Sequence, residues 1–401
     1  MVEENVLPGA TSMETIEEYV AEVRRLLKDF ETLTEEIITY YVQTCTRCLL
    51  CRTVCPVYRA TKEIIYSPEY RLATALRIIR GSKPSPDDVK SLFSCLLCGL
   101  CSMACPYGIG VWLAVLMARY KLASRGLAPR GLKEVAENCI RYGHSFTSEP
   151  HKAVSWARDA NLRLDEPGDY LYVPSPLENL RFPEKTVVKA ALMRRLGISF
   201  TVSSRIVDIG GNAGMDASRI DIGLAMLWRA YEEAERLGAR GIVVSECGSD
   251  VKLAFVVLPA VARALGLKTE KLLHLYDILA QRIQRLHISN ATSIFFTSCN
   301  FCRFTDKCPV RLLGLPGPRD KRPYTSCCGG GGGYTINLEP WARRIRRSIA
   351  SARLASIRAS EIVVPCIKCY TTLREAALLS KAKKRIVLVS EKVYEAIVGT
   401  P

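Results

Sequence analysis

The sequence lacks a long apolar segment. Its 401 residues contain no uninterrupted apolar run of about 18 residues, the length that a membrane-spanning helix requires. Residues 1–23 are acidic and have no apolar core, so we expect no secretory signal. The sequence therefore predicts a cytoplasmic protein, either soluble or held at the inner face of a membrane through a partner subunit.

Several kinds of catalytic signature are also missing. There is no paired-carboxylate motif, no Ser–His–Asp arrangement and no complete nucleotide-binding motif. The chain has four histidines, and none lies inside a cysteine motif, which favours packing or surface roles over haem ligation: His144, His151, His274 and His287. We therefore do not expect the chain to take electrons directly from NADH, a flavin or an organic donor.

The formal charge of +16 raises the question of a nucleic-acid partner. The basic residues are dispersed, however, and no segment interleaves them with aromatic residues in the way that single-stranded nucleic acid requires. A basic face toward an acidic partner subunit or anionic lipid fits the pattern equally well. We therefore predict no nucleic-acid partner.

Cysteine is abundant, with 17 residues. Disulfide frameworks are typical of small secreted domains, whereas most of these cysteines lie in tight arrays and no export signal precedes them. Metal ligation is the favoured interpretation.

Two arrays near the amino terminus share the spacing C-x2-C-x2-C-x3-C-P, which is typical of bacterial [4Fe–4S] ferredoxins. In this pattern the first three cysteines chelate one cluster, and the fourth binds the other. Zinc sites use separated pairs of ligands and match this spacing less well. The predicted ligand sets are Cys45, Cys48, Cys51 and Cys105 for one [4Fe–4S] cluster, and Cys95, Cys98, Cys101 and Cys55 for the other.

The residues between and after the arrays have helical periodicity, and this region resembles the α-helical ferredoxin domain of respiratory iron–sulfur subunits. After about residue 168, β-branched runs alternate with helical stretches, which is typical of βαβ units. We predict an α-helical ferredoxin domain followed by an α/β domain of two duplicated βαβ-type cysteine-rich repeats. The predicted segments are 1–40 (N-terminal helices), 41–125 (ferredoxin domain), 126–165 (linker with some helix), 166–288 (degenerate repeat) and 289–401 (intact repeat).

The duplication is predicted from three pairs of matching segments. TSIFFTSCN (292–300) matches DYLYVPSPL (169–177), and SCCGGGGGY (326–334) matches DIGGNAGMD (208–216). EIVVPCIKC (361–369) matches GIVVSECGSD (241–250). Two α/β units from one duplicated ancestor explain these matches.

The second repeat carries a further set of cysteines: Cys299, Cys327, Cys328, Cys366 and Cys369. This pattern, with CCGGGGG and VVPCIKCYTTL, resembles the cysteine-rich module found in the D and B subunits of heterodisulfide reductase. It is also similar to the iron–sulfur subunits of anaerobic glycerol-3-phosphate dehydrogenase and glycolate oxidase. The resemblance implies that these five cysteines are catalytic and bind a non-cubane [4Fe–4S] cluster. Zinc is the alternative, because four thiolates suffice for it.

The chain departs from the family pattern in its first repeat. Ser175 stands where a cysteine is expected, DIGGNAG replaces the CCG motif, and Cys247 is at most a remnant of the last motif. We therefore predict one active cysteine-rich site. Cys302 and Cys308 are extra thiols near that site, interpreted either as buried small hydrophobes or as an additional ligand or redox thiol. Cys139 is interpreted as structural.

The resemblance implies an iron–sulfur electron-transfer subunit that is catalytic only with partner subunits. Electrons would pass through two [4Fe–4S] clusters to the carboxy-terminal site, where a heterodisulfide-type substrate would be reduced. The alternative is a subunit that carries electrons from a flavin-linked glycolate, lactate or glycerol-3-phosphate dehydrogenase to quinone. The expected partners are a flavoprotein or a cytochrome b membrane subunit, with a thiol–disulfide couple or a quinone as acceptor.

Overall fold

The computed structural model describes residues 13–283, 292–309, 313 and 327–398. The first twelve residues of the predicted N-terminal segment lie outside the described residues, as do 284–291 at the predicted boundary between the repeats and most of the segment before Cys327. The terminal residues 399–401 are likewise outside them.

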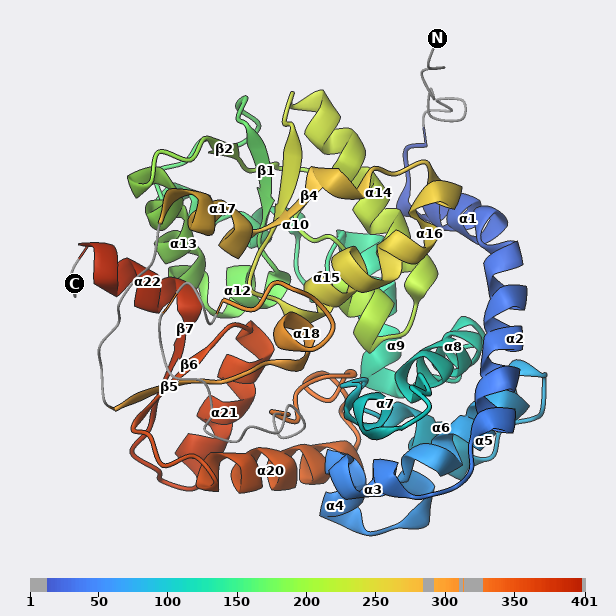
Figure 1. Ribbon diagram of the computed structural model, residues 1–401. Helices are drawn as coiled ribbons and strands as arrows, with labels where there is room; N and C mark the ends of the chain where they lie inside the picture. The colour runs from blue at the N-terminus through green and yellow to red at the C-terminus, as the bar shows by residue number, and fades with distance from the viewer. Residues whose placement is uncertain (1–12, 284–291, 310–312, 314–326, 399–401) are drawn as a thin grey trace.

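A pair of N-terminal helices runs along the outside of the molecule (Figure 1). Thr15 and Glu18 form a capping box that starts α1 (Ile16–Leu26), and α2 (Lys28–Thr44) follows. The apolar face of α1 packs against α14 (Ile220–Arg236), whereas α2 packs against α5 (Pro68–Ile79). The two helices therefore connect the cysteine arrays to the first sheet.

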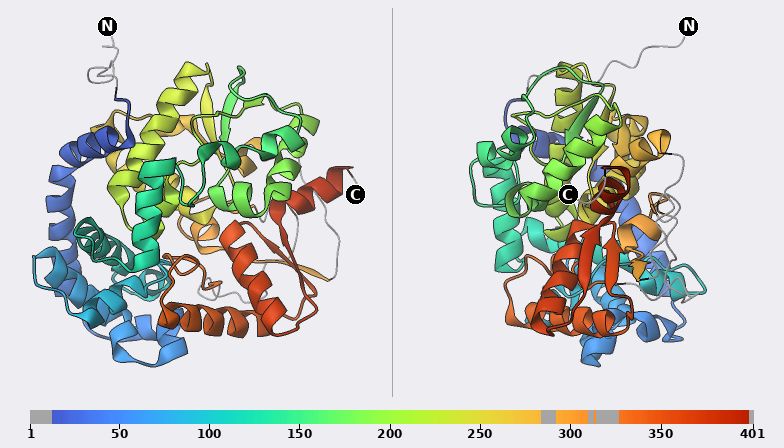
Figure 2. Two further views of the ribbon diagram at one scale, coloured as in Figure 1. Left: turned by 180° about the vertical axis from the view of Figure 1, so that it is seen from behind. Right: turned by 90° about the vertical axis from the view of Figure 1, so that its left-hand side faces the viewer.

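The region of the two arrays is built from helices, as predicted, and α5 and α8 form its main packed pair. Its elements after α2 are α3 (Leu50–Val54), α4 (Pro56–Thr61), η1 (Ile64–Tyr66), α5, α6 (Pro86–Phe93), α7 (Leu100–Ala104) and α8 (Val111–Ser124). Figure 2 shows this helical region from behind and from the side.

Three helices follow before the first strand: α9 (Arg130–Tyr142), α10 (Pro150–Ala153) and α11 (Trp156–Asp159). The buried face of α9 includes Cys139 and packs against η2 (Asn212–Asp216), and Trp156 packs edge-on against Tyr172 of the first sheet. This stretch, predicted to be a linker with some helix, therefore contributes to the core.

The first sheet has four parallel strands in the order β2-β1-β3-β4. Its central strands β1 and β3 are buried throughout, which explains their continuous apolar sequences. The strands are β1 (Tyr170–Val173), β2 (Phe200–Thr201), β3 (Gly241–Val244) and β4 (Leu272–His274). The other elements of this unit are α12 (Pro176–Arg181), α13 (Pro183–Arg195), η2, α14, α15 (Gly248–Lys252), η3 (Leu253–Val257), α16 (Leu258–Leu265), η4 (Thr269–Lys271) and α17 (Leu275–Arg282).

The second sheet has three parallel strands in the order β5-β6-β7. Its elements are β5 (Ser293–Phe295), α18 (Cys299–Cys302), α20 (Pro340–Ala355), β6 (Glu361–Val364), α21 (Ile367–Leu379), β7 (Arg385–Leu388) and α22 (Val389–Val398). The order β5-β6-β7 repeats the order β1-β3-β4. No strand among the described residues of the second unit corresponds to β2. The shared order is what a duplication would produce; the duplication itself stays a prediction.

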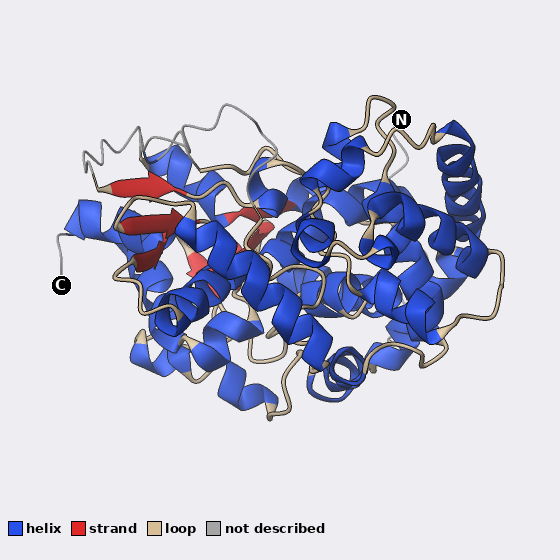
Figure 3. Cartoon of the chain, turned by 90° about the horizontal axis from the view of Figure 1, so that it is seen from below, coloured by secondary structure: helices blue, strands red, loops and turns tan. Residues whose placement is uncertain are grey.

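Helices surround both small sheets (Figure 3). A buried ionic group lies in the first unit: Lys189 of α13 is 2.5 Å from Glu178 of α12 and 3.1 Å from Glu246, and all three side chains are fully buried. Ser390 of α22 donates to Glu246 from both its backbone nitrogen and its hydroxyl. Among the helices of the described residues, none is both long and apolar enough to cross a lipid bilayer.

Candidate metal centres

The two arrays fold into matching loops. Arg47 and Leu49 of the first have positive φ angles of 55° and 65°, and Leu97 and Gly99, at the corresponding positions of the second, have φ of 51° and 72°. This left-handed backbone is uncommon for residues other than glycine. Each loop leads directly into a short helix, α3 or α7. The repeated conformation gives both arrays the same chelating turn.

Each predicted ligand set lines one cavity. The inner cysteine cavity is lined by Cys55, Cys95, Cys98 and Cys101. The outer cysteine cavity is lined by Cys45, Cys48, Cys51 and Cys105, with Cys101 shared between the two. In each set the fourth cysteine comes from the other array, which is the exchange that the spacing predicts. The donor sets contain only thiol sulfurs and therefore fit [4Fe–4S] clusters.

Two buried guanidinium groups flank the inner cysteine cavity. Arg71 of α5 lies 3.7 Å from the Cys55 sulfur and also donates to the Ser91 carbonyl and the Ser94 hydroxyl. Arg119 of α8 donates to the carbonyl of Cys95. Burial disfavours the charge on Arg71, but the neighbouring thiolates of Cys95 and Cys55 outweigh it, and the pKa of Arg71 is raised. A buried cation is costly unless it is compensated, so both arginines fit a site that carries negative charge.

Two further cations lie at the same loop. Lys252, at the end of α15, donates to the Leu97 carbonyl at 2.7 Å, and Arg303 donates to the Cys98 carbonyl at 2.6 Å. The Lys252 ammonium also lies over the rings of Trp112 and Phe304. Burial lowers the pKa of Lys252 to about 7, against the opposing effect of the nearby thiolates, of which Cys299 is the largest. Basic side chains therefore contact the loop of the second array from two further segments.

The outer cysteine cavity has a different environment. Cys48 is exposed, and Cys45, Cys51 and Cys105 are half-buried. The Cys51 thiol lies 3.6 Å from the carboxylate of Glu69, which also pairs with Arg52. Burial, followed by the Glu69 charge, raises the pKa of Cys51 to about 12. This cavity is therefore nearer to solvent and has a carboxylate where the inner one has guanidinium groups.

The five cysteines of the second repeat, which we call the third centre, come together from three segments: Cys299 at the start of α18, Cys327 and Cys328 before the glycine run, and Cys366 and Cys369 at the start of α21. The Cys369 thiol contacts the sulfurs of Cys328 and Cys366. The interaction with Cys369 lowers the pKa of Cys366 to about 7. Burial, together with the charges of Cys98 and Cys328, raises the pKa of Cys299 to about 12. A set of thiols alone fits either an iron–sulfur cluster or zinc.

The third centre adjoins the inner cysteine cavity, a relation that the sequence did not predict. Cys327 and Cys98 pack in one buried cluster, and the Cys327 thiol lowers the pKa of Cys98 to about 6. The Tyr334 hydroxyl donates to the Ser94 carbonyl at 2.7 Å. A sequence separation of more than 200 residues leaves no local signal for this junction. Lys252, whose ammonium bonds to the Leu97 carbonyl, also lies far from the second array in the sequence and gave no signal of this contact.

The glycine run between the third centre and α20 explains this close approach. Gly332 has a φ of 60°, and a Cβ on it would collide with the Cys95 carbonyl. A Cβ on Gly331 would meet the Leu96 carbonyl at 2.8 Å. Only glycine lets the two backbones pass at this separation. The run therefore joins the third centre to the second array.

In the first α/β unit, carboxylates and lysines lie at the segments that the predicted duplication matches to the cysteine motifs. Ser175 donates to Glu178, which belongs to the buried group around Lys189. Asp216 pairs with Lys368, which lies between Cys366 and Cys369 in the sequence. Burial raises the pKa of Asp250 to about 7, and its carboxylate accepts a hydrogen bond from the Gly211 amide. Cys247, at the start of α15, is buried beside this cluster.

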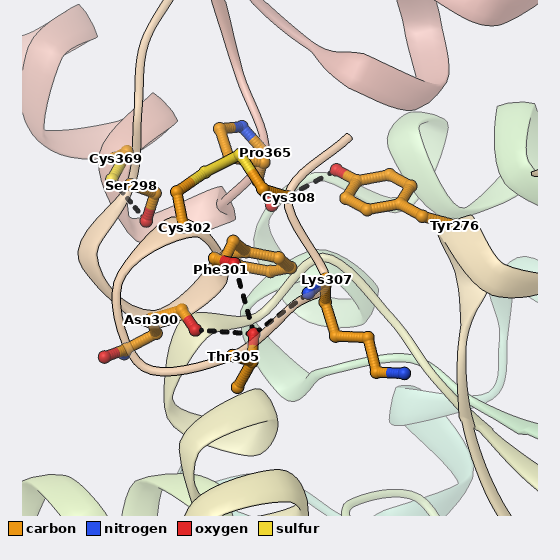
Figure 4. Close-up of a disulfide and its surroundings, with 10 residues drawn as sticks. All are labelled: Tyr276, Ser298, Asn300, Phe301, Cys302, Thr305, Lys307, Cys308, Pro365 and Cys369. Atoms are coloured by element: carbon orange, nitrogen blue, oxygen red, sulfur yellow. Dashed lines mark hydrogen bonds between the residues drawn. A yellow bond between two sulfur atoms is a disulfide. The ribbon is translucent and has the colours of Figure 1, made fainter. Parts of the chain in front are cut away.

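Cys302 and Cys308 form a disulfide (Figure 4). Both cysteines are half-buried. Their interpretation as small hydrophobic thiols is wrong in that the two sulfurs are bonded to each other, although both residues pack partly buried against the core. His274, by contrast, has the predicted packing role: it is fully buried, and its ring nitrogens bond to the Ser245 carbonyl and the Tyr276 amide.

Comparison with known protein families agrees with this geometry. Residues 41–109 match the 4Fe-4S dicluster domain, and residues 294–374 match the cysteine-rich domain called CCG. The chain is therefore an iron–sulfur protein that combines these two domains.

The relatives carry names of oxidoreductase subunits. The chain is 26% identical over 246 residues to an Hdr-like menaquinol oxidoreductase iron-sulfur subunit of Archaeoglobus profundus, covering 52% of this chain and 44% of that protein. It is 21% identical over 399 residues to the D subunit of the dihydromethanophenazine:CoB--CoM heterodisulfide reductase of Methanosarcina mazei, covering 89% and 94%. It is 32% identical over 141 residues to lactate utilization protein B of Bacillus licheniformis, covering 34% and 29%. The resemblance predicted from the cysteine motifs is confirmed.

Proposed function

We propose that this protein is the electron-transferring subunit of a cytoplasmic oxidoreductase complex, and that its third centre reduces a disulfide substrate. Electrons enter at the outer cysteine cavity, pass to the inner one and leave through the third centre. The observation that carries this proposal is that Cys98 and Cys327 pack in one buried cluster, which places the third centre against the inner cysteine cavity.

The order of the three sites supports a direction from surface to interior. Cys48 of the outer cavity is exposed, whereas the cysteines of the inner cavity are buried. A partner subunit that docks at Cys48 can therefore deliver electrons to the outer cavity. Cys101 lines both cavities, so the next transfer is to the inner one. We propose a flavoprotein or a cytochrome b membrane subunit as this partner, with the complex at the inner face of the membrane.

The residues of the third centre fit a bound metal group. The five cysteines are linked by pairwise contacts, and four of them are buried: Cys327, Cys328, Cys366 and Cys369. An iron–sulfur cluster held there would store and release single electrons. The similarity to the D subunit of heterodisulfide reductase, over 94% of that protein, favours a cluster and disulfide chemistry.

A second candidate function has its own support. The Archaeoglobus relative is named a menaquinol oxidoreductase subunit and the Bacillus relative a lactate utilization protein. The first repeat also has carboxylates and Ser175 in place of a second set of cysteines. The alternative is therefore a subunit that carries electrons between a flavin-linked 2-hydroxy-acid dehydrogenase and a quinone.

A viologen assay separates the two candidates. With reduced methyl viologen as donor, we expect the anaerobically purified protein to reduce a low-molecular-weight disulfide, and Cys328→Ala to lower this rate to background. Cys247→Ala is the matched control: Cys247 begins α15 as Cys366 begins α21, yet it lies outside the third centre. This control should keep the wild-type rate. A wild-type protein that reduces a quinone analogue but no disulfide would overturn the proposal in favour of the alternative.

A further inference from the structure

We propose that Cys302 and Cys308 form a redox-active disulfide that exchanges electrons between the third centre and an external disulfide. This inference rests on the proposed function and assigns its point of substrate contact. The bond closes a sequence separation of only 6 residues. Short closed loops gain less conformational stabilisation from a disulfide than long ones, so a purely structural role is a weak explanation.

The loop between the two cysteines is already held by hydrogen bonds. The Thr305 hydroxyl donates to the carbonyls of Asn300 and Phe301 and accepts from the Lys307 amide. Lys307 in turn pairs with Asp277 of α17 at 3.0 Å. These contacts hold the loop without the disulfide, so the two sulfurs can separate and rejoin with little movement of the backbone.

Helix α18 connects the disulfide to the third centre. Cys299 begins this helix and Cys302 ends it, and residues three apart lie on the same side of a helix. Ser298, immediately before the helix, accepts a hydrogen bond from the Cys369 sulfur at 3.6 Å. The side chain of Asn300 donates to the Gly248 carbonyl and so fixes the helix on the first unit. Figure 4 shows the hydrogen bond between Cys369 and Ser298 together with the disulfide.

Accessibility distinguishes this pair from the third centre. Cys302 and Cys308 are half-buried, whereas four of the five third-centre cysteines are buried. The half-buried pair is therefore more accessible to an external disulfide than the four buried thiols are. The pair thus lies where a sulfur substrate can make contact.

The chemistry balances in two stages. A reductant that supplies two electrons one at a time, passed on by the cluster that the third-centre cysteines would hold, and two protons from water would break the Cys302–Cys308 bond and give two thiols. One thiolate then attacks the external disulfide, which forms a mixed disulfide and releases one substrate thiol. Attack by the other cysteine restores the Cys302–Cys308 bond and releases the second thiol. The sum is one external disulfide, two electrons and two protons converted into two thiols.

Alkylation tests the first stage without an activity assay. The full chain, purified anaerobically with its clusters, is incubated with reduced methyl viologen and quenched with N-ethylmaleimide, and residues 302 and 308 are followed by peptide mass spectrometry. We expect both cysteines to be unmodified before reduction and alkylated after it. In Cys328→Ala, which perturbs the third centre and leaves both ferredoxin arrays intact, the disulfide should stay closed.

Three results would overturn the inference: a disulfide that stays closed in the reduced wild type, one that opens equally in Cys328→Ala, or an iron content that falls in Cys302→Ser and Cys308→Ser because the two cysteines are ligands.

The double variant Cys302→Ser/Cys308→Ser separates this inference from the proposed function. We expect it to lose disulfide reduction while keeping its iron and its third-centre electron paramagnetic resonance signal. A double variant as active as the wild type would reject the relay alone, whereas a wild type with no such activity would reject the proposed function.

Discussion

Replacing Lys189 with methionine should lower the free energy of unfolding by about 3–5 kcal/mol. The ammonium lies between Glu178 and Glu246, and all three side chains are fully buried. The two carboxylates oppose the effect of burial and raise the pKa of Lys189. Without the lysine, two carboxylates would face each other with no cation in the interior. Anaerobic guanidinium denaturation followed by circular dichroism measures the change.

An exposed ion pair gives the matched control. Arg130 and Glu134 lie 2.7 Å apart, one turn from each other on α9, with the arginine side chain 82% exposed. Arg130→Met should change stability by less than about 1 kcal/mol, because exposed pairs contribute little. If Lys189→Met were no more destabilising than this control, the buried ion pairs of Lys189 would not stabilise the fold more than an exposed pair does.

Replacing Arg71 with glutamine should lower the midpoint potential of the cluster bound in the inner cysteine cavity. Reduction adds a negative charge, and the buried guanidinium 3.7 Å from the Cys55 sulfur stabilises that charge. We expect at least a tenfold change in the ratio of oxidised to reduced cluster at fixed potential, or about 59 mV. A redox titration followed by electron paramagnetic resonance measures it, with iron content checked against the wild type.

The reciprocal variant is Glu69→Gln beside the outer cysteine cavity. Glu69 lies 3.6 Å from the Cys51 sulfur, so loss of its charge should raise the potential of the outer cluster and leave the inner one unchanged. If Arg71→Gln shifted the inner potential by less than about 20 mV, roughly a twofold change in ratio, local charge would not set the potential difference between the clusters. A shift of both clusters in either variant would point to a general structural change.

Local patterns explain which parts of the site could be predicted. The spacing of each ferredoxin array predicts its chelating loop and the exchange of the fourth cysteine between the arrays. In the structure, Cys55 lies with the cysteines of the second array and Cys105 with those of the first. Parallel strands were predicted from the alternation of β-branched runs and helices, because fully buried strands read as continuous apolar sequence.

Long-range contacts explain what was missed. The packing of Cys98 against Cys327 and the pairing of Asp216 with Lys368 join residues more than 100 positions apart, and neither leaves a periodic signal. The Cys302–Cys308 disulfide was missed for a different reason. Cys302 also completes a C-x2-C spacing with Cys299, so the sequence alone could not separate a ligand from a disulfide partner.

The central claim is that one chain holds three contiguous redox centres, and metal analysis tests it most directly. The protein is purified anaerobically, and iron, acid-labile sulfide and zinc are counted per chain. We predict about twelve irons and about twelve sulfides, which correspond to three four-iron clusters. About eight irons with about one zinc would contradict the claim, because the third centre would then be a structural zinc site with no part in electron transfer.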